Sequence, residues 1–570
     1  MMPGGKKRLP IGIEDFEEIC TRNYYYVDKT GLIADLLNSG GKVTLFTRPR
    51  RFGKTLNMSM LETFFAPESN KNIFDGLEIS EETEICKSYM GKHPVISISL
   101  KGIDASQYTT AYAMAAGLVR EAAQKYEAIL LNSERLTESE KTDLQLLLDI
   151  GMPEQVLFKS LKTLSRLLKK HYGQKTVILI DEYDVPLANS YTYGYYDQMI
   201  LLLRNLFHQA LKTNENLEMA VLTGCMRISK ESIFTGLNNL KVRSIMDEEF
   251  DEYFGFTDTE VLELMDYYGY TEYYSAAKDW YDGYTFGQTA VYCPWDVICY
   301  CDKLRSDSDR SPENFWLNSS GNQAIRQLIR CGSAESVKGE IETLLAGGIV
   351  EKTIQQNLTY PEMYASIENI WSVLYTTGYL TRRGQRHGYS IPLAIPNKEL
   401  CNIFSEQILD LFREETQQDG EALKTFCDAL QSGNIAAIET SMNNYLRRTI
   451  SVWDTAVRTS LKENFYHGLL LGILAVKADW AVSSNQESGN GYSDIQIRDW
   501  KNSLGMIIEV KYADDGDLES TCRKGLTQIE VKRYADRMQD ERFQTILKYG
   551  MAFYMKESRV MMTSQRMNGF

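Results

Sequence analysis

The feature that most constrains this chain is a series of short apolar runs that alternate with helical patterns between residues 42 and 240. Four runs are rich in β-branched residues: VTLFT (43–47), VISISL (95–100), TVILI (176–180) and MAVLT (219–223). They are almost continuously apolar, as are strands of a parallel sheet that is covered on both faces. We therefore expect an α/β domain whose parallel sheet is flanked by helices.

The first apolar run leads directly into RPRRFGKT (48–55) and then into a stretch with helical spacing of apolar residues. A strand, a Gly-Lys-Thr loop and a helix in this order are typical of a phosphate-binding P-loop. Gly53 would let the backbone approach a phosphate, Lys54 would contact its oxygens, and Thr55 would hold Mg²⁺. Arg51 and Phe52 complete the predicted nucleotide-binding loop.

The loop departs from the general motif, because Arg48 stands where the first glycine is expected and is followed by Pro49, Arg50 and Arg51. The three arginines could serve phosphate binding or a contact with another subunit, and the loop could also be an ordinary basic turn. For an arginine that completes a neighbour's site in an oligomer, the candidates are Arg50, Arg51 and Arg243.

The third apolar run ends in two adjacent carboxylates, in TVILIDEYD (176–184). Asp181 is expected to hold Mg²⁺ and Glu182 to polarise the attacking water, beside the P-loop. A buried strand that ends in a solvated acidic turn is the alternative interpretation. Thr223 and Arg227 follow the fourth run and are candidates to sense the γ-phosphate. The combined motifs predict an ATP site.

A second group of polar residues lies near the C-terminus. Glu509 and Lys511 lie two residues apart in one apolar run, so they share a face of the expected strand. Asp494 would join them if its own run pairs as a hairpin, and Glu463 on the preceding helix offers a third acid. Two converging carboxylates bind Mg²⁺ or Mn²⁺, and a lysine can orient water for attack on a phosphodiester. A degenerate, inactive version of such a site is the alternative.

Charge limits where nucleic acid could bind. The 62 basic and 77 acidic residues give a net charge of −15, so the whole molecule is not a general binder of polyanions. The segment from Arg523 to Arg566 reverses the sign, with ten basic and five acidic residues. Gln528 and Tyr534 in this segment are candidates for contacting nucleic acid.

The ten cysteines form no CxxC pair, and no run approaches 18 apolar residues. A reduced, cytoplasmic compartment is expected, with no membrane segment.

Several motifs in the expected order resemble the AAA-ATPase-like family of bacterial proteins: LPIGIEDF, YYYVDKT, RPRRFGKT, LIDEYD, LTGCMRISKESIFTGLNNL and YFGFT. In that family RPRRFGK is the usual loop. The C-terminal segment is similar to a PD-(D/E)xK superfamily nuclease domain. The resemblance implies ATP binding through Lys54, Thr55 and Asp181, and a nuclease core with Glu463, Asp494, Glu509 and Lys511. Gln528 and Tyr534 match the motif after that core.

The expected fold class is α/β and multidomain, in four parts. These are an ATPase domain over 1–245, a helical lid or connector over 246–345, a winged-helix-like region over 346–425, and a restriction-endonuclease-like α/β domain over 426–570. In the last part we expect two strands, a polar loop over 483–491 and a helix from Gly525.

Two functional hypotheses follow. In the first, an ATPase controls a nuclease that acts on nucleic acid, most simply DNA, in defence or mobile-element biology. In the second, the chain is a nucleotide-switched regulator or scaffold whose nuclease fold is an inactive binding module.

Overall fold

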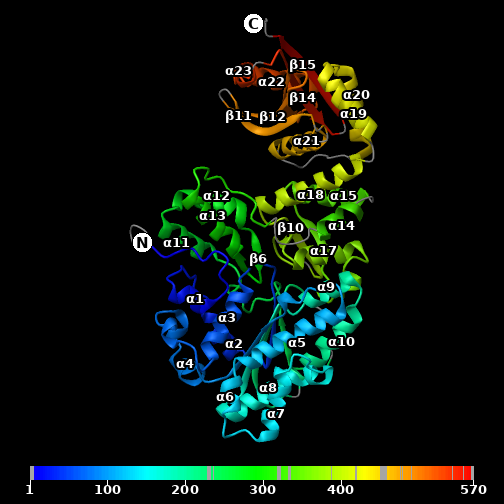
Figure 1. Cartoon of the computed structure of the whole chain (residues 1–570). Helices are drawn as coiled ribbons and strands as arrows, with labels where there is room; N and C mark the ends of the chain where they lie inside the picture. The colour runs from blue at the N-terminus through cyan, green and yellow to red at the C-terminus, as the bar shows by residue number, and fades with distance from the viewer. Residues whose placement is uncertain are drawn as a thin grey trace. The chain divides into compact units, whose positions relative to one another are not determined.

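A computed structural model describes residues 6–566, apart from residues 213, 228–232, 235, 317–322, 332–334, 387, 418–419, 450–458, 475–476, 478, 489–490, 542 and 556. The chain divides into two compact units (Figure 1). Unit 1 comprises Met1–Ser320 with Glu351–Leu400, and unit 2 comprises Gly321–Val350 with Cys401–Phe570. The finer division into four parts stays a prediction.

Unit 1 is built on a parallel sheet of five strands in the order β2-β3-β4-β1-β5. The strands are β1 (Val43–Thr47), β2 (Val95–Ser99), β3 (Thr176–Asp181), β4 (Leu217–Gly224) and β5 (Leu240–Arg243). All of β1 and β3 is buried, which explains their continuous apolar runs. The four expected strands and the parallel sheet are therefore confirmed.

Helices of unit 1 surround this sheet, and α3, α5 and α8 pack directly on its strands. The helices up to the fourth strand are α1 (Phe16–Thr21), α2 (Gly31–Asn38), α3 (Lys54–Phe65), α4 (Thr83–Tyr89), α5 (Tyr108–Gln124), α6 (Glu127–Leu131), α7 (Glu138–Leu148), α8 (Glu154–Tyr172), α9 (Val185–Tyr193) and α10 (Tyr196–Phe207). In α8, Leu157, Leu161, Leu164 and Leu168 recur at helical spacing and are buried, and the left-handed Gly173 ends the helix.

The rest of unit 1 contains a small helical layer and a second sheet. The layer has α11 (Asp258–Tyr268), α12 (Tyr274–Tyr281) and α13 (Pro294–Ser306), with a hairpin of β6 (Tyr284–Phe286) and β7 (Thr289–Val291). The sheet has the order β8-β10-β9 and accompanies α16 and α17; these elements are β8 (Val350–Thr353), α16 (Tyr360–Met363), α17 (Ile367–Thr376), β9 (Thr381–Arg382) and β10 (Ser390–Ala394).

Unit 2 contains a mixed five-stranded sheet in the sequential order β11 to β15. The strands are β11 (Ala481–Ser488), β12 (Gly491–Asp499), β13 (Leu504–Tyr512), β14 (Thr545–Tyr554) and β15 (Glu557–Arg566). Only the β13–β14 pair is parallel, and α22 (Leu518–Val531) and α23 (Asp536–Asp540) connect its strands. The other helices are α14 (Gln323–Cys331), α15 (Glu335–Leu345), α18 (Lys398–Gln417, which begins in unit 1), α19 (Gly420–Ser432), α20 (Ile435–Thr449) and α21 (Thr459–Leu474).

Three expectations for unit 2 are wrong. The segment expected to be a polar loop from 483 to 491 is largely strand β11, although residues 489–490 lie outside the described part. The closing helix begins at Leu518 rather than at Gly525. Two further strands, β14 and β15, follow it. The serines and the glutamine of β11 do not indicate a strand in the sequence. The segment is a strand because its backbone pairs with that of β12.

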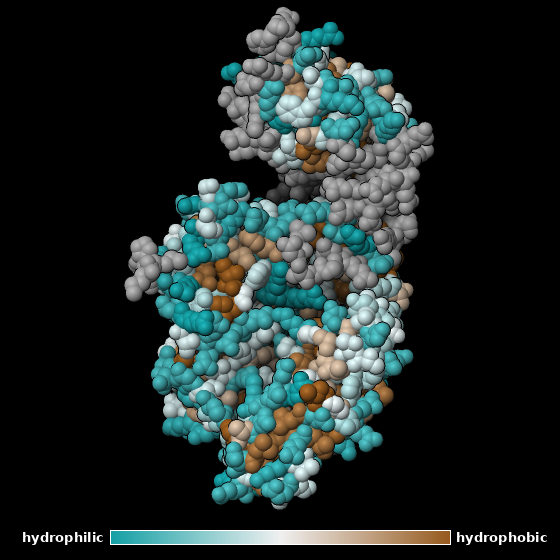
Figure 2. Space-filling model, viewed as in Figure 1, coloured by the Kyte–Doolittle hydropathy of each residue, from teal (hydrophilic) through white to brown (hydrophobic). Residues whose placement is uncertain are grey.

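Among the described residues, no helix has the length and apolar character needed to cross a bilayer. Figure 2 shows one face of the molecule, on which hydrophilic residues predominate and apolar residues gather in several patches, a broad one of them near the bottom of the view.

Candidate nucleotide site and candidate nuclease site

The loop between β1 and α3 makes its turn without the first glycine of the general motif. Gly53 precedes the first residue of α3 and has a left-handed φ of 77°. Arg51 is also left-handed, with φ of 70°, an uncommon backbone conformation for a residue with a side chain. Two left-handed residues therefore bend the loop, and the N-terminus of α3 faces the space where a phosphate would bind.

Arg48 is a structural residue. Its side chain is buried and donates hydrogen bonds to the carbonyl oxygens of Thr47, Arg243 and Phe250. The guanidinium also lies 4.9 Å from the ring centre of Phe254. Burial lowers the pKa of Arg48 to about 10. The idea that all three loop arginines are available to a phosphate or another subunit is therefore wrong for Arg48.

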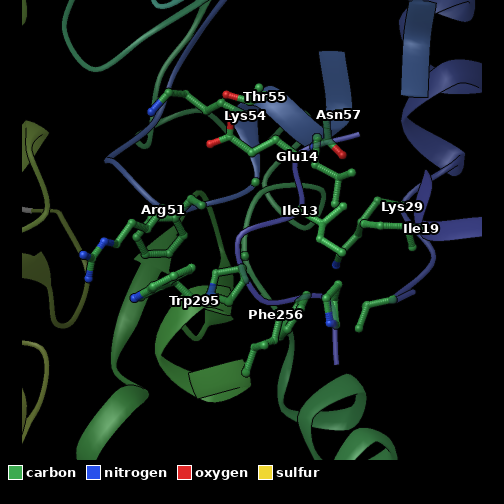
Figure 3. A pocket seen from close by; sticks show the side chains of 18 of the residues that line it. Ile13, Glu14, Ile19, Lys29, Arg51, Lys54, Thr55, Asn57, Phe256 and Trp295 are labelled. Carbon is green, nitrogen blue, oxygen red and sulfur yellow. The ribbon is translucent and has the colours of Figure 1, made fainter. Parts of the chain in front are cut away.

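The side chains of Arg51 and Phe52 make contacts with the part of unit 1 that follows the parallel sheet. Arg51 donates to the carbonyl oxygen of Phe315, and its guanidinium lies 5.2 Å from the ring centre of Trp295 (Figure 3). Phe52 is fully buried against Tyr284. Both residues line the cavity described below. The two side chains join the loop to the helical layer of unit 1.

Lys54 is buried against the backbone of the loop between β1 and α3. Its Nζ atom donates to the carbonyl oxygens of Arg48 at 3.2 Å and Pro49 at 2.9 Å. It also lies 3.2 Å from Oε1 of Glu182. Burial by itself lowers the pKa of Lys54, but the neighbouring Cys225, Glu182 and Asp184 groups raise it above its ordinary value overall. A positive charge is thus held at the loop.

Asp181 lies at the end of β3, and its carboxylate contacts hydroxyl groups from three neighbouring elements. Thr55 Oγ1 lies 2.9 Å from its Oδ2, Ser99 Oγ lies 3.4 Å from the same atom, and Thr223 donates to Oδ1. Burial raises the pKa of Asp181. Ser99 was missed by sequence reasoning, since only the β2–β3 register brings it opposite Asp181.

Glu182 follows with a left-handed φ of 52°, and its backbone N–H donates to Thr223 Oγ1 at 3.2 Å. Thr223 is buried and already satisfied by Asp181 and Glu182, so it links two strand ends and does not face the cavity. The half-buried Arg227 has its Nε atom buried without a hydrogen-bond partner among the described atoms. Residues 228–232, which follow it in the family-like motif, lie outside the described part of the chain.

Asp184 is a further residue that the sequence did not single out. It is buried, and its Oδ2 atom accepts hydrogen bonds from the backbone N–H groups of Cys225 at 2.9 Å and Met226 at 3.0 Å. Burial, and then the charge of Glu182, raise the pKa of Asp184 to about 6. The residue joins the end of β3 to the loop after β4.

A cavity of about 520 Å³ lies beside these residues, in the size range of small-molecule sites. Gly53, Lys54, Thr55 and Glu182 line one end of it. Figure 3 shows Lys54 and Thr55 at this end, and Ile13, Ile19, Trp295 and Phe256 toward the other. The arrangement can hold a ligand with a charged end and an apolar end.

In unit 2, the β12–β13 hairpin brings the predicted residues together. Asp494 Oδ2 accepts a hydrogen bond from the backbone N–H of Val510 at 2.8 Å. Lys511 Nζ lies 3.0 Å from Glu509 Oε1 and 3.9 Å from Glu463 Oε2. Glu463 Oε1 also accepts from the backbone N–H of Tyr512 at 3.3 Å. Lys511 thus lies between two of the predicted acids.

Glu509 is fully buried, and its Oε2 atom has no hydrogen-bond partner among the described atoms. Burial, and then the charge of Asp494, raise the pKa of Glu509 to about 7. Such a carboxylate is well suited to a divalent cation, which would neutralise it. However, among the described residues no three His, Cys, Asp or Glu side chains are gathered into a ready cation site. Asp494 and Glu463 accept hydrogen bonds from the backbone of β13.

The remaining predicted residues of unit 2 lie nearby. Gln528 Nε2 lies 3.3 Å from the hydroxyl oxygen of Tyr534, which is itself buried. The two are therefore paired, and little of Tyr534 is open to a partner. His467 Nε2 contacts the carbonyl oxygen of Asp494 at 2.8 Å and Ser484 Oγ at 3.1 Å. This histidine holds the strand that carries Asp494.

The fold and the two sites define a protein with a P-loop NTPase domain and a nuclease-like domain. A family model described as "Predicted AAA-ATPase" matches residues 10–234, and one described as "PD-(D/E)XK nuclease superfamily" matches residues 461–563. The chain is also 32% identical over 543 residues to "Uncharacterized protein in vnfD 5'region" of Azotobacter chroococcum mcd 1. The matched region covers 93% of this chain and 94% of the relative. The chain belongs to this AAA-ATPase-like family with a C-terminal PD-(D/E)XK nuclease superfamily domain.

Proposed function

We propose that unit 1 binds and hydrolyses ATP. The observation that carries this proposal is the contact between Thr55 and Asp181 beside Lys54, at the charged end of a cavity. Lys54 would bind the β and γ phosphates, and Thr55 with Asp181 would hold Mg²⁺, which would neutralise phosphate charge when bound. Glu182 would accept the proton of the attacking water and release Lys54 to the nucleotide.

The test is ATP binding by calorimetry and phosphate release by the purified chain. Lys54→Ala is expected to remove both, while Lys87→Ala, on the surface of α4, is expected to leave both unchanged. Binding of ATP by the Lys54 variant with wild-type affinity would refute the assignment.

We propose further that unit 2 cleaves phosphodiester bonds of nucleic acid. The supporting observation is Lys511, placed between Glu509 and Glu463 and beside the hairpin contact of Asp494. Asp494, Glu509 and Glu463 would hold Mg²⁺ or Mn²⁺, which would supply Lewis acidity and an activated water. Lys511 would orient that water and stabilise the charge that develops on the phosphate.

The test is incubation of plasmid, single-stranded DNA and RNA with Mg²⁺ or Mn²⁺, with and without ATP. Lys511→Ala should lose cleavage and keep ATP turnover, and Lys501→Ala, in the exposed β12–β13 turn, should behave as wild type. Cleavage that persists in the Lys511 variant would reject the site. An effect of ATP on the rate would support control of the nuclease by the nucleotide state.

One observation favours the alternative of a nucleotide-switched regulator with an inactive nuclease fold. Asp494 and Glu463 accept hydrogen bonds from the backbone of β13, and Glu509 is paired with Lys511, so these acids have partners within unit 2. Under this alternative neither variant cleaves, but Lys54→Ala alters oligomeric state or partner binding. The proposal also includes DNA as the substrate, self-association of the chain, a cytoplasmic location and a role in defence or mobile-element biology.

A further inference from the structure

The loop between β1 and α3 is connected to the start of α18 by a short series of contacts. Arg51 of the loop donates to the carbonyl oxygen of Phe315. The backbone N–H groups of Phe315 and Trp316 donate to Glu399, in the first turn of α18. We call these four residues the Arg51–Glu399 link. We propose that nucleotide binding at the loop loosens the first turns of α18 through this link. The inference rests on the proposed ATP binding and adds a route of regulation to it.

The link is closely packed, so a displacement at one end is felt at the other. Trp316 and Glu399 are buried, and Trp316 stacks on Tyr284 with the ring centres 6.4 Å apart. Arg51 Nη1 also lies 3.9 Å from Oδ1 of Asp296, a buried neighbour of Glu399. Close-packed interiors have little free space in which a shift can be absorbed.

The loop end of the link depends on the same lysine that a nucleotide would bind. Lys54 Nζ donates to the carbonyl oxygens of Arg48 and Pro49, two and three residues before Arg51. A triphosphate competes with these carbonyls for Lys54, because hydrogen bonds to a charged phosphate oxygen are stronger. Once Lys54 turns to the phosphate, the two carbonyls lose their donor. The backbone that carries Arg51 is then held less firmly.

The other end of the link anchors the first turn of α18. Glu399 accepts two backbone hydrogen bonds in a buried place, and their loss would leave both N–H groups unsatisfied. The neighbouring Lys398 is paired with Asp279 at 2.7 Å, but both side chains are more than half exposed. Such a surface pair contributes little to stability. The firmness of this helix end therefore depends strongly on Glu399.

The position of this turn in the chain gives the link its regulatory meaning. Within α18 the chain passes from unit 1 into unit 2, after Leu400. Helix ends open locally at a lower free energy than the core does, so a modest change in their contacts alters how often they open. A nucleotide bound in unit 1 can in this way change the stiffness of a connection to unit 2 through the chain itself.

Two substitutions interrupt the link at different points. Glu399→Ala removes the acceptor of the two N–H groups, and Arg51→Met removes the donor to Phe315. Glu368→Ala is the matched control, because Glu368 also lies in the first turn of a helix of unit 1 but is exposed. Since Arg51 lines the cavity, calorimetry first measures the affinity of each variant for the β,γ-imido analogue of ATP with Mg²⁺. The analogue is then supplied at saturation.

The readout is hydrogen–deuterium exchange of the backbone amides of residues 400–404. In wild type the analogue should speed their exchange about fivefold. In Glu399→Ala and Arg51→Met, exchange should already be fast and should change less than about twofold with the analogue. Glu399→Gln keeps an oxygen acceptor and should respond as wild type does, as should Glu368→Ala. Slow exchange of the buried strand β3 in every variant shows that unit 1 is folded.

Three results would overturn the inference in different ways. If wild type binds the analogue but exchange at residues 400–404 is unchanged, the link carries no signal while the proposed ATP binding stands. If Glu399→Ala or Arg51→Met is folded and responds as wild type does, the signal takes another path. If wild type does not bind the analogue, the proposed function fails, and the regulation with it.

Discussion

Thr55 Oγ1 lies 2.9 Å from Asp181 Oδ2, although the two residues are 126 positions apart. Thr55 lies in the first turn of α3, which follows β1, whereas Asp181 ends β3, and β4 lies between these two strands in the sheet. Thr223 at the end of β4 also donates to Asp181. The carboxyl ends of parallel strands lie at the same edge of a sheet. The buried carboxylate of Asp181 at the end of β3 can therefore contact the Gly-Lys-Thr loop that follows β1.

Glu182→Gln is expected to separate ATP binding from hydrolysis. The amide keeps the shape of the side chain but cannot accept the proton of water, so turnover should fall at least about 100-fold. ATP affinity should stay near wild type, because Lys54, Thr55 and Asp181 remain. Phosphate release and calorimetry measure the two effects. Glu84→Gln, an exposed acid on α4, is the control, and full turnover in the Glu182 variant would remove this residue from the mechanism.

Arg48→Met is expected to destabilise unit 1, since it leaves the carbonyls of Arg243 and Phe250 without their donors. Loss of hydrogen bonds from a charged, buried group should lower the free energy of unfolding by about 2–4 kcal/mol. Arg22→Met, at an exposed position next to α1 in the same unit, should change it by less than about 0.5 kcal/mol. Chemical denaturation compares the two variants, and equal effects would contradict the structural role of Arg48.

Thr223→Val should also cost stability, by about 1–3 kcal/mol, because Asp181 loses a donor and the N–H of Glu182 loses an acceptor. Valine has nearly the same shape, so packing is little changed. Thr192→Val, on the exposed face of α9, is the matched control and should stay within about 0.5 kcal/mol of wild type. Thermal unfolding measures both, and a neutral Thr223 variant would argue against this link.

Glu399 and Asp296 form a buried carboxyl pair whose effect depends on pH. Burial, and then Asp296, raise the pKa of Glu399 from 4.5 to about 9. The folded chain therefore holds a proton that the unfolded chain releases. This stabilisation is complete below pH about 4.5 and is lost as the pH rises toward 9.

Glu399→Gln should make stability less dependent on pH over this range. Its amide oxygen can still accept from the backbone N–H groups of Phe315 and Trp316. Thermal unfolding at pH 5.5, 7 and 8.5 compares the variant with wild type and with Glu134→Gln at an exposed position. Parallel curves for Glu399→Gln and wild type would show that the pair does not hold this proton.

The sequence alone predicted the features that depend on neighbours in the chain. The apolar runs identified the four main strands of unit 1, and GKT with the DE pair identified residues at the charged end of the cavity. The two-residue spacing of Glu509 and Lys511 placed them on one face of a strand, and the hairpin with Asp494 followed from adjacent runs. Each of these inferences uses local periodicity, which a sequence displays directly.

Only the tertiary structure decided which side chains face the cavity and which face the core. It buried Arg48, turned Arg51 toward Trp295, and brought Ser99 beside Asp181 through strand order. It also made a strand of the polar residues in β11 and built the apolar end of the cavity from Ile13 and Trp295, 282 positions apart. The physical reason is that burial and hydrogen-bond partners depend on contacts between distant segments, which local patterns do not encode.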